Sequence, residues 1–197
     1  MKIIASVPVE VMIATFLQAE VNSPRFRDSL LRLLVRDHQD RRSLERPDVN
    51  SATENVYRAH LLGEWRGYGQ NTDVFTDLPD DTRWVRAILE RSDLAQVKYI
   101  NDDYWTDFSG GSRFVLDAVA RIQSGAIHSG EAACYREFAK AITAGARFPE
   151  VILLYNPRTE ELVVLEGHIR LTSYLLWAEG QPIELTVLLG ISERMQK

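Results

Sequence analysis

The chain has 197 residues, of which 45% are hydrophobic and 26% are charged, a balance typical of a globular protein with one substantial core. The formal net charge of -5 and the lack of a long basic run argue against a protein that grips DNA or RNA through its overall field. Cys134 is the single cysteine, which excludes an intrachain disulfide and a cysteine-rich zinc site.

The first residues do not have the pattern of a targeting signal. They carry one positive charge and a short apolar run that Glu10 soon interrupts, which is too short for a signal peptide. No stretch approaches the roughly 20 apolar residues that a membrane-spanning helix needs. A single cysteine also fits a reducing compartment. We therefore expect a cytoplasmic protein without a membrane partner.

Three helices are predicted in the first 70 residues. Apolar residues at helical spacing predict the first helix over 9–22. Ser23 is expected to cap the second helix, with Pro24 at its first position. The third helix is predicted over 51–65, before a glycine-rich turn. The polar, arginine-rich segment 37–50 between them is predicted to be a loop.

The middle of the chain mixes a strand, a loop and helices. Partial alternation of apolar residues predicts a strand over 84–89, and a helix is expected to start at 92–94. The densest polar and aromatic segment, 101–113, is predicted to be a loop. Two helices, 114–123 and 131–144, are expected to follow it, each ending near a glycine.

The last third has the clearest pattern. It predicts strand, turn, strand, helix and strand, in the order 151–155, 156–159, 161–165, 167–179 and 183–189. The Gly180-Gln181-Pro182 segment is expected to stop the helix. Since no repeat or linker is visible, we predict an α+β protein with a single domain, 1–197. Its N-terminal part, 1–130, would be mostly helical, and its core would be 131–192.

The junction between the second of these strands and the helix carries a recognisable motif, Glu166-Gly167-His168-Ile169-Arg170. It resembles the signature of the ParB/sulfiredoxin superfamily: an acidic residue or glycine, a glycine, two variable polar residues and an arginine at a strand-to-helix junction. The resemblance covers about 131–192. It implies a small mixed sheet with helices, and a nucleotide whose phosphates lie at the motif.

The physical chemistry of the motif points to an anion site independently of the family. Gly167 lets the backbone turn sharply and lets a phosphate approach closely. The helix that follows offers unpaired N–H groups and a partial positive charge. Arg170 can fork onto phosphate oxygens, and His168 can donate to them or move a proton. Glu166 can hold magnesium or accept a hydroxyl proton. The alternative is that Glu166 and Arg170 pair with neighbours and that His168 is a surface residue whose hydrogen bonds are satisfied.

Two departures from the family narrow the expected activity. Sulfiredoxins carry a catalytic cysteine where this chain has His168, so we do not expect reduction of cysteine sulfinic acid, and Cys134 is expected to be a buried apolar residue of a helix. Partition-type ParB proteins continue into a helix-turn-helix region, which we do not expect here. The resemblance that remains is to free-standing members, including free amino-acid kinases that transfer phosphate from a nucleotide to a serine hydroxyl.

The 101–113 segment is a second candidate site. Asp102 and Asp103 are predicted magnesium ligands, and Asp107 a base. Backbone N–H groups of a Ser-Gly-Gly-Ser sequence can form an anion nest before a helix. The predicted phosphate contacts are Ser109, Gly110, Gly111, Ser112 and Arg113, together with Gly167, His168, Arg170 and Thr172. The alternative is a surface loop that caps a helix, with Trp105 anchored in the core.

These features lead to three functional hypotheses. The first is an enzyme that transfers phosphate from ATP or CTP, with Mg²⁺, to a small-molecule hydroxyl, or hydrolyses the nucleotide; its catalytic residues would be Glu166, His168 and Asp107. The second is a non-catalytic, nucleotide-gated switch or adaptor. The third, disfavoured by the acidic charge, is a DNA-associated protein of plasmid or phage type. A homodimer or a protein partner is left open.

Overall fold

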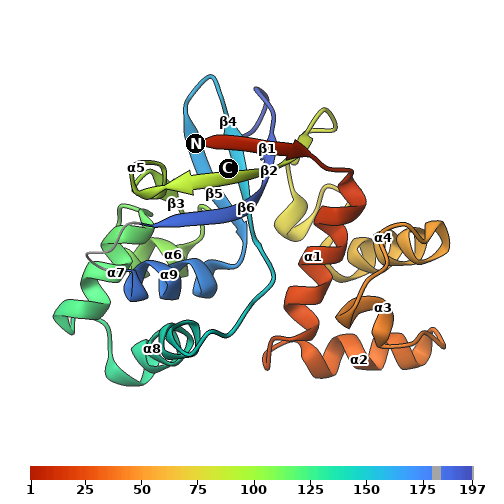
Figure 1. Ribbon diagram of the computed structural model, residues 1–197, viewed down its shortest axis with the longest axis horizontal. Coiled ribbons are helices and arrows are strands. Elements are labelled where there is room, and N and C mark those ends of the chain that lie inside the picture. Colours follow the sequence, from red (N-terminus) through yellow and green to blue (C-terminus); the bar gives the residue numbers. More distant parts are fainter. Residues whose placement is uncertain (179–182, 197) are drawn as a thin grey trace. The chain divides into compact units, whose positions relative to one another are not determined.

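The computed structural model describes residues 1–178 and 183–196, and it shows a mixed α+β protein (Figure 1). The chain forms two compact units: a helical unit, residues 7–80, and a sheet unit, residues 1–6 together with 81–197. The sequence predicted one domain whose core begins at 131. The structure differs because the sheet unit also takes up the first six residues and residues 81–130.

The helical unit contains the elements that the sequence predicted, with different bounds. Its helices are α1 (Val9–Val21), α2 (Arg27–Arg36), α3 (Arg42–Glu45) and α4 (Ala52–Arg66), followed by the 3-10 turn η1 (Asp73–Phe75). Helix α1 contacts α2, α3 and α4. The predicted cap at Ser23 is wrong, because Ser23 accepts from the amides of Phe26 and Arg27 in a turn, and α2 begins only at Arg27.

The predicted loop 37–50 contains the short helix α3, and a buried arginine of α4 explains why this segment is ordered. Arg58 is fully buried and donates to the carbonyl oxygens of Ser43 (3.0 Å) and Asp48 (2.8 Å). Its Nη1 also pairs with Glu54 of the same helix at 2.7 Å. The carbonyl oxygens of the segment thus accept hydrogen bonds from the buried guanidinium, whose burial without partners would cost free energy.

The sheet unit is built on a mixed sheet. Its described strands are β1 (Lys2–Ser6), β2 (Arg83–Glu90), β3 (Val97–Lys98), β4 (Val151–Asn156), β5 (Glu161–Glu166) and β6 (Glu184–Ile191). They lie in the order β1-β2-β6-β4-β5-β3, with β4 parallel to β6 and antiparallel to β5. Strands β1, β2 and β3 come from the part of the chain that the sequence predicted to be mostly helical.

Helices cover one face of this sheet, as Figure 1 shows for α6 to α9. The helices of this unit are α5 (Arg91–Leu94), α6 (Asp103–Phe108), α7 (Val115–Ser124), α8 (Ser129–Thr143) and α9 (His168–Trp177). Alternate strand residues such as Leu153 and Val164 pack with Leu171 and Leu175 of α9 in one hydrophobic core. Cys134 of α8 is only half-buried at the margin of this core.

The sequence predicted the last third most accurately. Strands 151–155 and 161–165, the intervening turn, the helix and the final strand are all confirmed. The predicted end of the helix at 179 and the stop at 180–182 lie outside the described residues. The predicted loop 101–113 differs, since α6 occupies its centre.

None of the helices in the described part of the chain is both long enough and apolar enough to cross a membrane.

Candidate functional site at the start of α9

The junction between β5 and α9 turns at Gly167, which adopts φ +99°. A side chain there would be strained, and its Cβ would lie 3.0 Å from Nη2 of Arg170 and 3.2 Å from Cγ2 of Val151. Gly167 is the N-cap of α9, and no side chain caps the helix. The amide groups of its first turn are therefore left to water or to a ligand.

Arg170 is held at this junction by two groups. Its Nη2 pairs with the carboxylate of Glu166, and its Nη1 donates to the carbonyl oxygen of Pro149 at 2.5 Å. The Arg170 and Glu166 side chains are 12% and 17% exposed, so the pair lies near the surface without being open to it. Burial lowers the pKa of Arg170 to about 10, which leaves the guanidinium charged at neutral pH. The ion pair between Glu166 and Arg170 agrees with the alternative interpretation of the motif, in which both residues pair with neighbours.

His168 is the first residue of α9, and its ring lies in an aromatic stack. The ring stacks on Trp105 with centroids 4.7 Å apart and planes 14° apart, and it lies 5.9 Å from the ring of Tyr99. Its Nε2 is buried and has no hydrogen-bond partner in the described part of the chain. Burial lowers the pKa of His168 to about 3, so the ring is neutral at pH 7.

Thr172 supports the stack from the interior. Its side chain is fully buried, and its hydroxyl donates to the carbonyl oxygen of His168 at 2.8 Å. The same hydroxyl lies 2.5 Å from that of Tyr99. With both bonds made inside the protein, Thr172 has a structural role in this conformation, whereas the sequence predicted a phosphate contact.

The two segments that the sequence singled out separately meet at the Trp105–His168 stack. Helix α6, which carries Trp105, lies within one of them, and α9 opens the other. Tyr99 links both, because its carbonyl oxygen accepts from Arg113 and its hydroxyl contacts Thr172. Sequence reasoning missed Tyr99, since a lone tyrosine after a strand of two residues gives no signal.

The acidic residues of the 101–113 segment do not converge on a common point. Asp102 caps α6 by accepting from the amides of Tyr104 (3.0 Å) and Trp105 (3.4 Å). Asp103 and Asp107 are exposed. Within residues 1–178 and 183–196, no group of three or more His, Cys, Asp or Glu side chains could hold a metal ion.

The glycine-rich part of this segment makes its hydrogen bonds within the protein. Ser109 is buried, and its hydroxyl accepts from the amide of Arg113 at 2.8 Å. The Arg113 guanidinium donates to the carbonyl oxygen of Tyr99, and Ser112 accepts from the amide of Phe114. Gly110, Gly111 and Arg113 have positive φ angles in this turn. Helix α7 begins without a side-chain cap, so Ser109 and Ser112 stabilise the turn and do not cap the helix.

A small hollow of about 190 Å³ lies beside α6. Tyr104 lines it and donates to Glu131 at 2.8 Å, while the adjacent Trp105 stacks on His168. Asp107 and His128 also line this hollow. The predicted base Asp107 therefore lines this hollow, whereas Glu166 and His168 do not.

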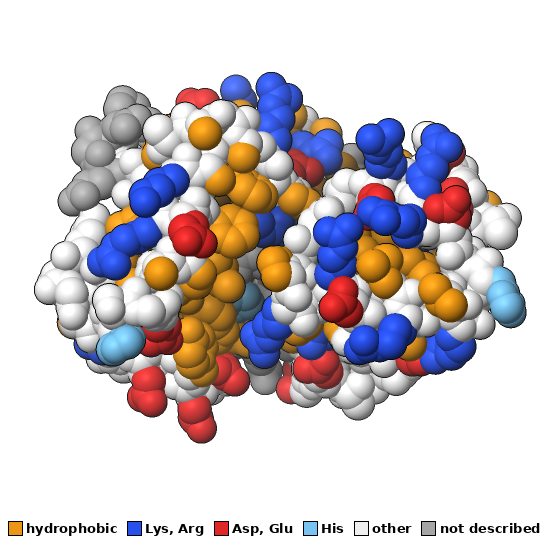
Figure 2. Space-filling view, turned by 90° about the horizontal axis from the view of Figure 1, so that it is seen from below, with side chains coloured by type: hydrophobic (Ala, Val, Ile, Leu, Met, Phe, Trp, Pro, Cys, Tyr) orange, Lys and Arg blue, Asp and Glu red, His pale blue; other side chains and the backbone are white. Residues whose placement is uncertain are grey.

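Apolar side chains are exposed around the helices of the sheet unit. Figure 2, which views the molecule from the helix side of the sheet, shows hydrophobic side chains gathered in a band. Ile169, in the first turn of α9, is 37% exposed, and Phe148, next to Pro149, is 39% exposed. The ring of Phe148 lies 5.2 Å from that of Phe138 on α8. Exposed apolar side chains thus lie near the first turn of α9.

Comparisons with family models, with curated proteins and with solved structures found no match to this chain.

Proposed function

We propose that the sheet unit is a ParB/sulfiredoxin-like module that binds a nucleoside triphosphate, ATP or CTP, with its phosphates at the start of α9. The proposal includes transfer of the terminal phosphate to a small-molecule hydroxyl, or its hydrolysis. The supporting features are an uncapped helix N-terminus, a left-handed Gly167 and a charged Arg170 in the first turn.

One observation carries the proposal: the buried Nε2 of His168 has no partner among the described residues, at the first position of an uncapped helix. Buried polar atoms without a partner are uncommon, because each costs the free energy of its lost hydrogen bond to water. A ligand oxygen that reached Nε2 would remove this cost. The neutral ring has one donor and one acceptor nitrogen, so Nε2 can donate to a phosphate oxygen.

Binding would exchange the partner of Arg170. In the structure its guanidinium pairs with Glu166, and a phosphate offers the same forked geometry with more charge. Once Arg170 turned to the phosphate, the Glu166 carboxylate would be free. It could then accept a proton or help to hold Mg²⁺, which in nucleotide sites is bound largely through the phosphates and one or two carboxylates.

The transfer step that fits these residues is a displacement at the terminal phosphorus. The acceptor oxygen forms a bond to that phosphorus, the bond to the bridging oxygen breaks, and a nucleoside diphosphate leaves. The hydroxyl proton passes to Glu166. Positioning and charge neutralisation dominate catalysis of such transfers, which suits a site with one arginine and one helix N-terminus. Magnesium supplies further charge neutralisation when bound.

A non-catalytic switch is the second candidate, and the Arg170–Pro149 bond favours it. This bond ties α9 to the segment just before β4. Release of Arg170 to a nucleotide would break the tie and free the backbone around the exposed Phe148. Binding would then alter the apolar surface without any turnover.

Thermal unfolding with Mg²⁺ and ATP, CTP, GTP or ADP tests the proposal. We expect one nucleotide to raise the midpoint of the wild type, and Arg170→Gln to weaken its binding by about tenfold or more, which is at least 1.4 kcal/mol. Arg32→Gln, on the exposed face of α2, is the matched control and should bind like the wild type. No shift with any nucleotide, or an equal shift in Arg170→Gln, would contradict the proposal.

Turnover separates the two candidates. ³¹P NMR can monitor hydrolysis or transfer of the nucleotide by the wild type and by Glu166→Gln. A diphosphate product is expected only if the chain is an enzyme. Binding without product, with loss of binding in Arg170→Gln, would support the switch.

A further inference from the structure

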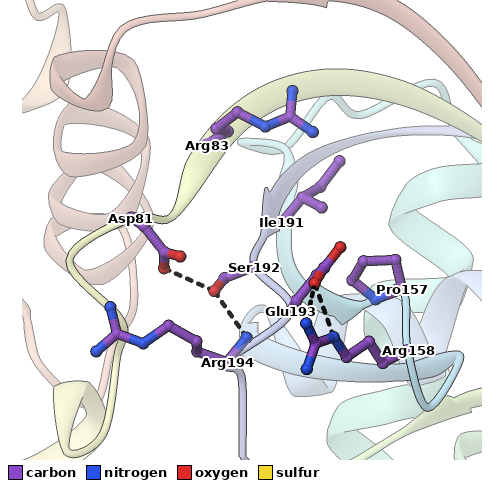
Figure 3. Close-up of a pocket in the computed structure, with 8 residues that line it drawn as sticks. All are labelled: Asp81, Arg83, Pro157, Arg158, Ile191, Ser192, Glu193 and Arg194. Carbon is purple, nitrogen blue, oxygen red and sulfur yellow. Dashed lines mark hydrogen bonds and ion pairs between the residues drawn. The ribbon is translucent and has the colours of Figure 1, made fainter.

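A second hollow of about 340 Å³ lies at one end of the sheet (Figure 3). Three segments surround it: the start of β2, the turn between β4 and β5, and the residues that follow β6. Its lining residues are Asp81, Arg83, Pro157, Arg158, Ile191, Ser192, Glu193 and Arg194. The volume is within the range of small-molecule sites, so a ligand of modest size would fit.

This hollow is distinct from the site at α9. The antiparallel β4–β5 pair brings Glu166 opposite Ile152 at one end and Glu161 opposite Asn156 at the other. The α9 site follows the first of these ends, and the hollow lies at the second. Six residues of extended strand separate them by roughly 20 Å, at ~3.3 Å per residue.

The frame of the hollow is held by hydrogen bonds between its segments. The amide of Ser192 donates to the carbonyl oxygen of Tyr155 at 3.2 Å, and Asn156 donates to that of Met195 at 2.8 Å. The Ser192 hydroxyl donates to Asp81 at 2.7 Å, which joins the end of β6 to the approach to β2. The segments that line the hollow are therefore held together by hydrogen bonds.

Arg83 is the side chain that points to a ligand. It is exposed on β2, and its guanidinium makes no hydrogen bond or ion pair with any residue that the structure describes. Figure 3 shows its guanidinium above Ile191, on the side of the hollow away from Glu193 and Arg158. A guanidinium without a counter-charge at the rim of a hollow is suited to a forked contact with an oxyanion.

Arg158 offers a second cation on the opposite wall. Its Nη2 pairs with Glu193 at 2.7 Å, but the two side chains are 72% and 57% exposed. Exposed ion pairs of this kind contribute little to stability, so an incoming anion can replace Glu193 at modest cost. Asp81, the other acid of the lining, is engaged by Ser192. The hollow can thus present two guanidinium groups to one ligand.

We propose that this hollow binds the phosphate group of a small phosphate monoester between Arg83 and Arg158, with Ile191 and Pro157 against the rest of the molecule. A dianion gains more from two guanidinium groups than a carboxylate does, which favours phosphate over a monocarboxylate. The site does not depend on the proposed nucleotide site.

Titration of the full chain with phenyl phosphate, followed by amide chemical shifts in ¹H–¹⁵N NMR, tests this assignment residue by residue. We expect the largest shifts at Arg83, Arg158 and 192–194. Arg83→Gln should weaken binding about tenfold, and Arg158→Gln should weaken it less, because Arg158 must first leave Glu193. The exposed Arg83 side chain makes no hydrogen bond or ion pair with the described residues, so its variant should keep the dispersed spectrum of the wild type.

Two controls separate this site from others. Arg170→Gln and Arg42→Gln, an exposed arginine of α3, should leave the shifts at this hollow unchanged. Shifts confined to the start of α9 would overturn the proposal while supporting the nucleotide site. Equal binding by Arg83→Gln would also overturn it, as would benzoate binding as tightly as phenyl phosphate.

Discussion

The two units of the chain contain the same local pair, a glutamate and an arginine four residues later, in opposite settings. In the helical unit, Glu54 and Arg58 lie within α4, and the fully buried Arg58 donates to two carbonyl oxygens of the preceding segment. Its Nε has no partner among the described residues. In the sheet unit, Glu166 ends β5 and Arg170 lies in the first turn of α9, with 12% of its side chain exposed. Identical spacing therefore does not indicate identical roles.

The difference lies in what else each guanidinium binds. Arg58 donates to Ser43, Asp48 and Asn55 besides Glu54, and this set of partners fixes the fold around it. Arg170 has one carboxylate and one carbonyl oxygen beside an uncapped helix N-terminus. An arginine with a replaceable partner at the margin of the protein is the better candidate for a ligand contact.

Replacement of Arg58 should have the largest effect on stability. Arg58→Met removes donors from two backbone carbonyl oxygens in the interior, and we expect a loss of about 3 kcal/mol in the free energy of unfolding. Urea unfolding followed by circular dichroism measures it. Arg42→Met, exposed on α3, is the control and should stay close to the wild type. A similar midpoint for Arg58→Met and the control would show that the enclosed arginine does not hold the segment.

Replacement of Arg170 should lower the stability less than replacement of Arg58 does, and it should weaken nucleotide binding. Arg170→Met breaks the bonds to Glu166 and Pro149, but Glu166 is near enough to the surface to regain water, so we expect a loss of about 2 kcal/mol. The same urea experiment measures it. A loss as large as that of Arg58→Met would mean that both pairs are structural, and the comparison between them would fail.

Substitution of Gly167 tests how tightly the junction is built. Gly167→Ala places a Cβ on a left-handed backbone and within 3.0 Å of Nη2 of Arg170, for which we expect a loss of about 1–2 kcal/mol. Gly125→Ala is a matched control, because Gly125 has φ +77° with no atom near the added Cβ. Differential scanning calorimetry should show the larger decrease in unfolding midpoint for Gly167→Ala. Equal decreases would mean that the Arg170 side chain moves away from the added Cβ without cost.

The pH dependence of stability tests the buried ring of His168 at the same junction. Burial lowers the pKa of His168 from 6.5 to about 3, so the unfolded chain binds a proton that the folded chain does not. Stability is therefore lost as the pH falls from 6.5 towards 3, by up to about 1.4 kcal/mol per pH unit.

His168→Phe keeps a ring against Trp105 but removes the titration. Its free energy of unfolding should fall less than that of the wild type between pH 7 and pH 5. His60→Gln, an exposed control, should follow the wild type. If His168→Phe also followed it, the pKa of His168 would be the same in the folded and unfolded chain.

The sequence predicted elements well where one local pattern was sufficient. The buried run 151–155 and the alternation at 84–89 are both strands, because continuous or alternating apolar residues determine a strand without reference to distant neighbours. It failed at 37–50 and at 101–113, which it predicted to be loops. Helix α3 depends on Arg58, fifteen residues away from Ser43, and α6 depends on an aspartate cap and on stacking against His168.

By itself the sequence determined the strand–turn–strand–helix order of the last third and the position of Gly167 at the junction, since glycine, chain reversal and apolar periodicity act over a few residues. Only the tertiary structure decided that Arg170 pairs with Glu166, that Trp105 stacks on His168, and that Arg83 and Arg158 line one hollow. Those contacts join residues from different elements, and the packing of the sheet selects them from among many partners of equal chemistry.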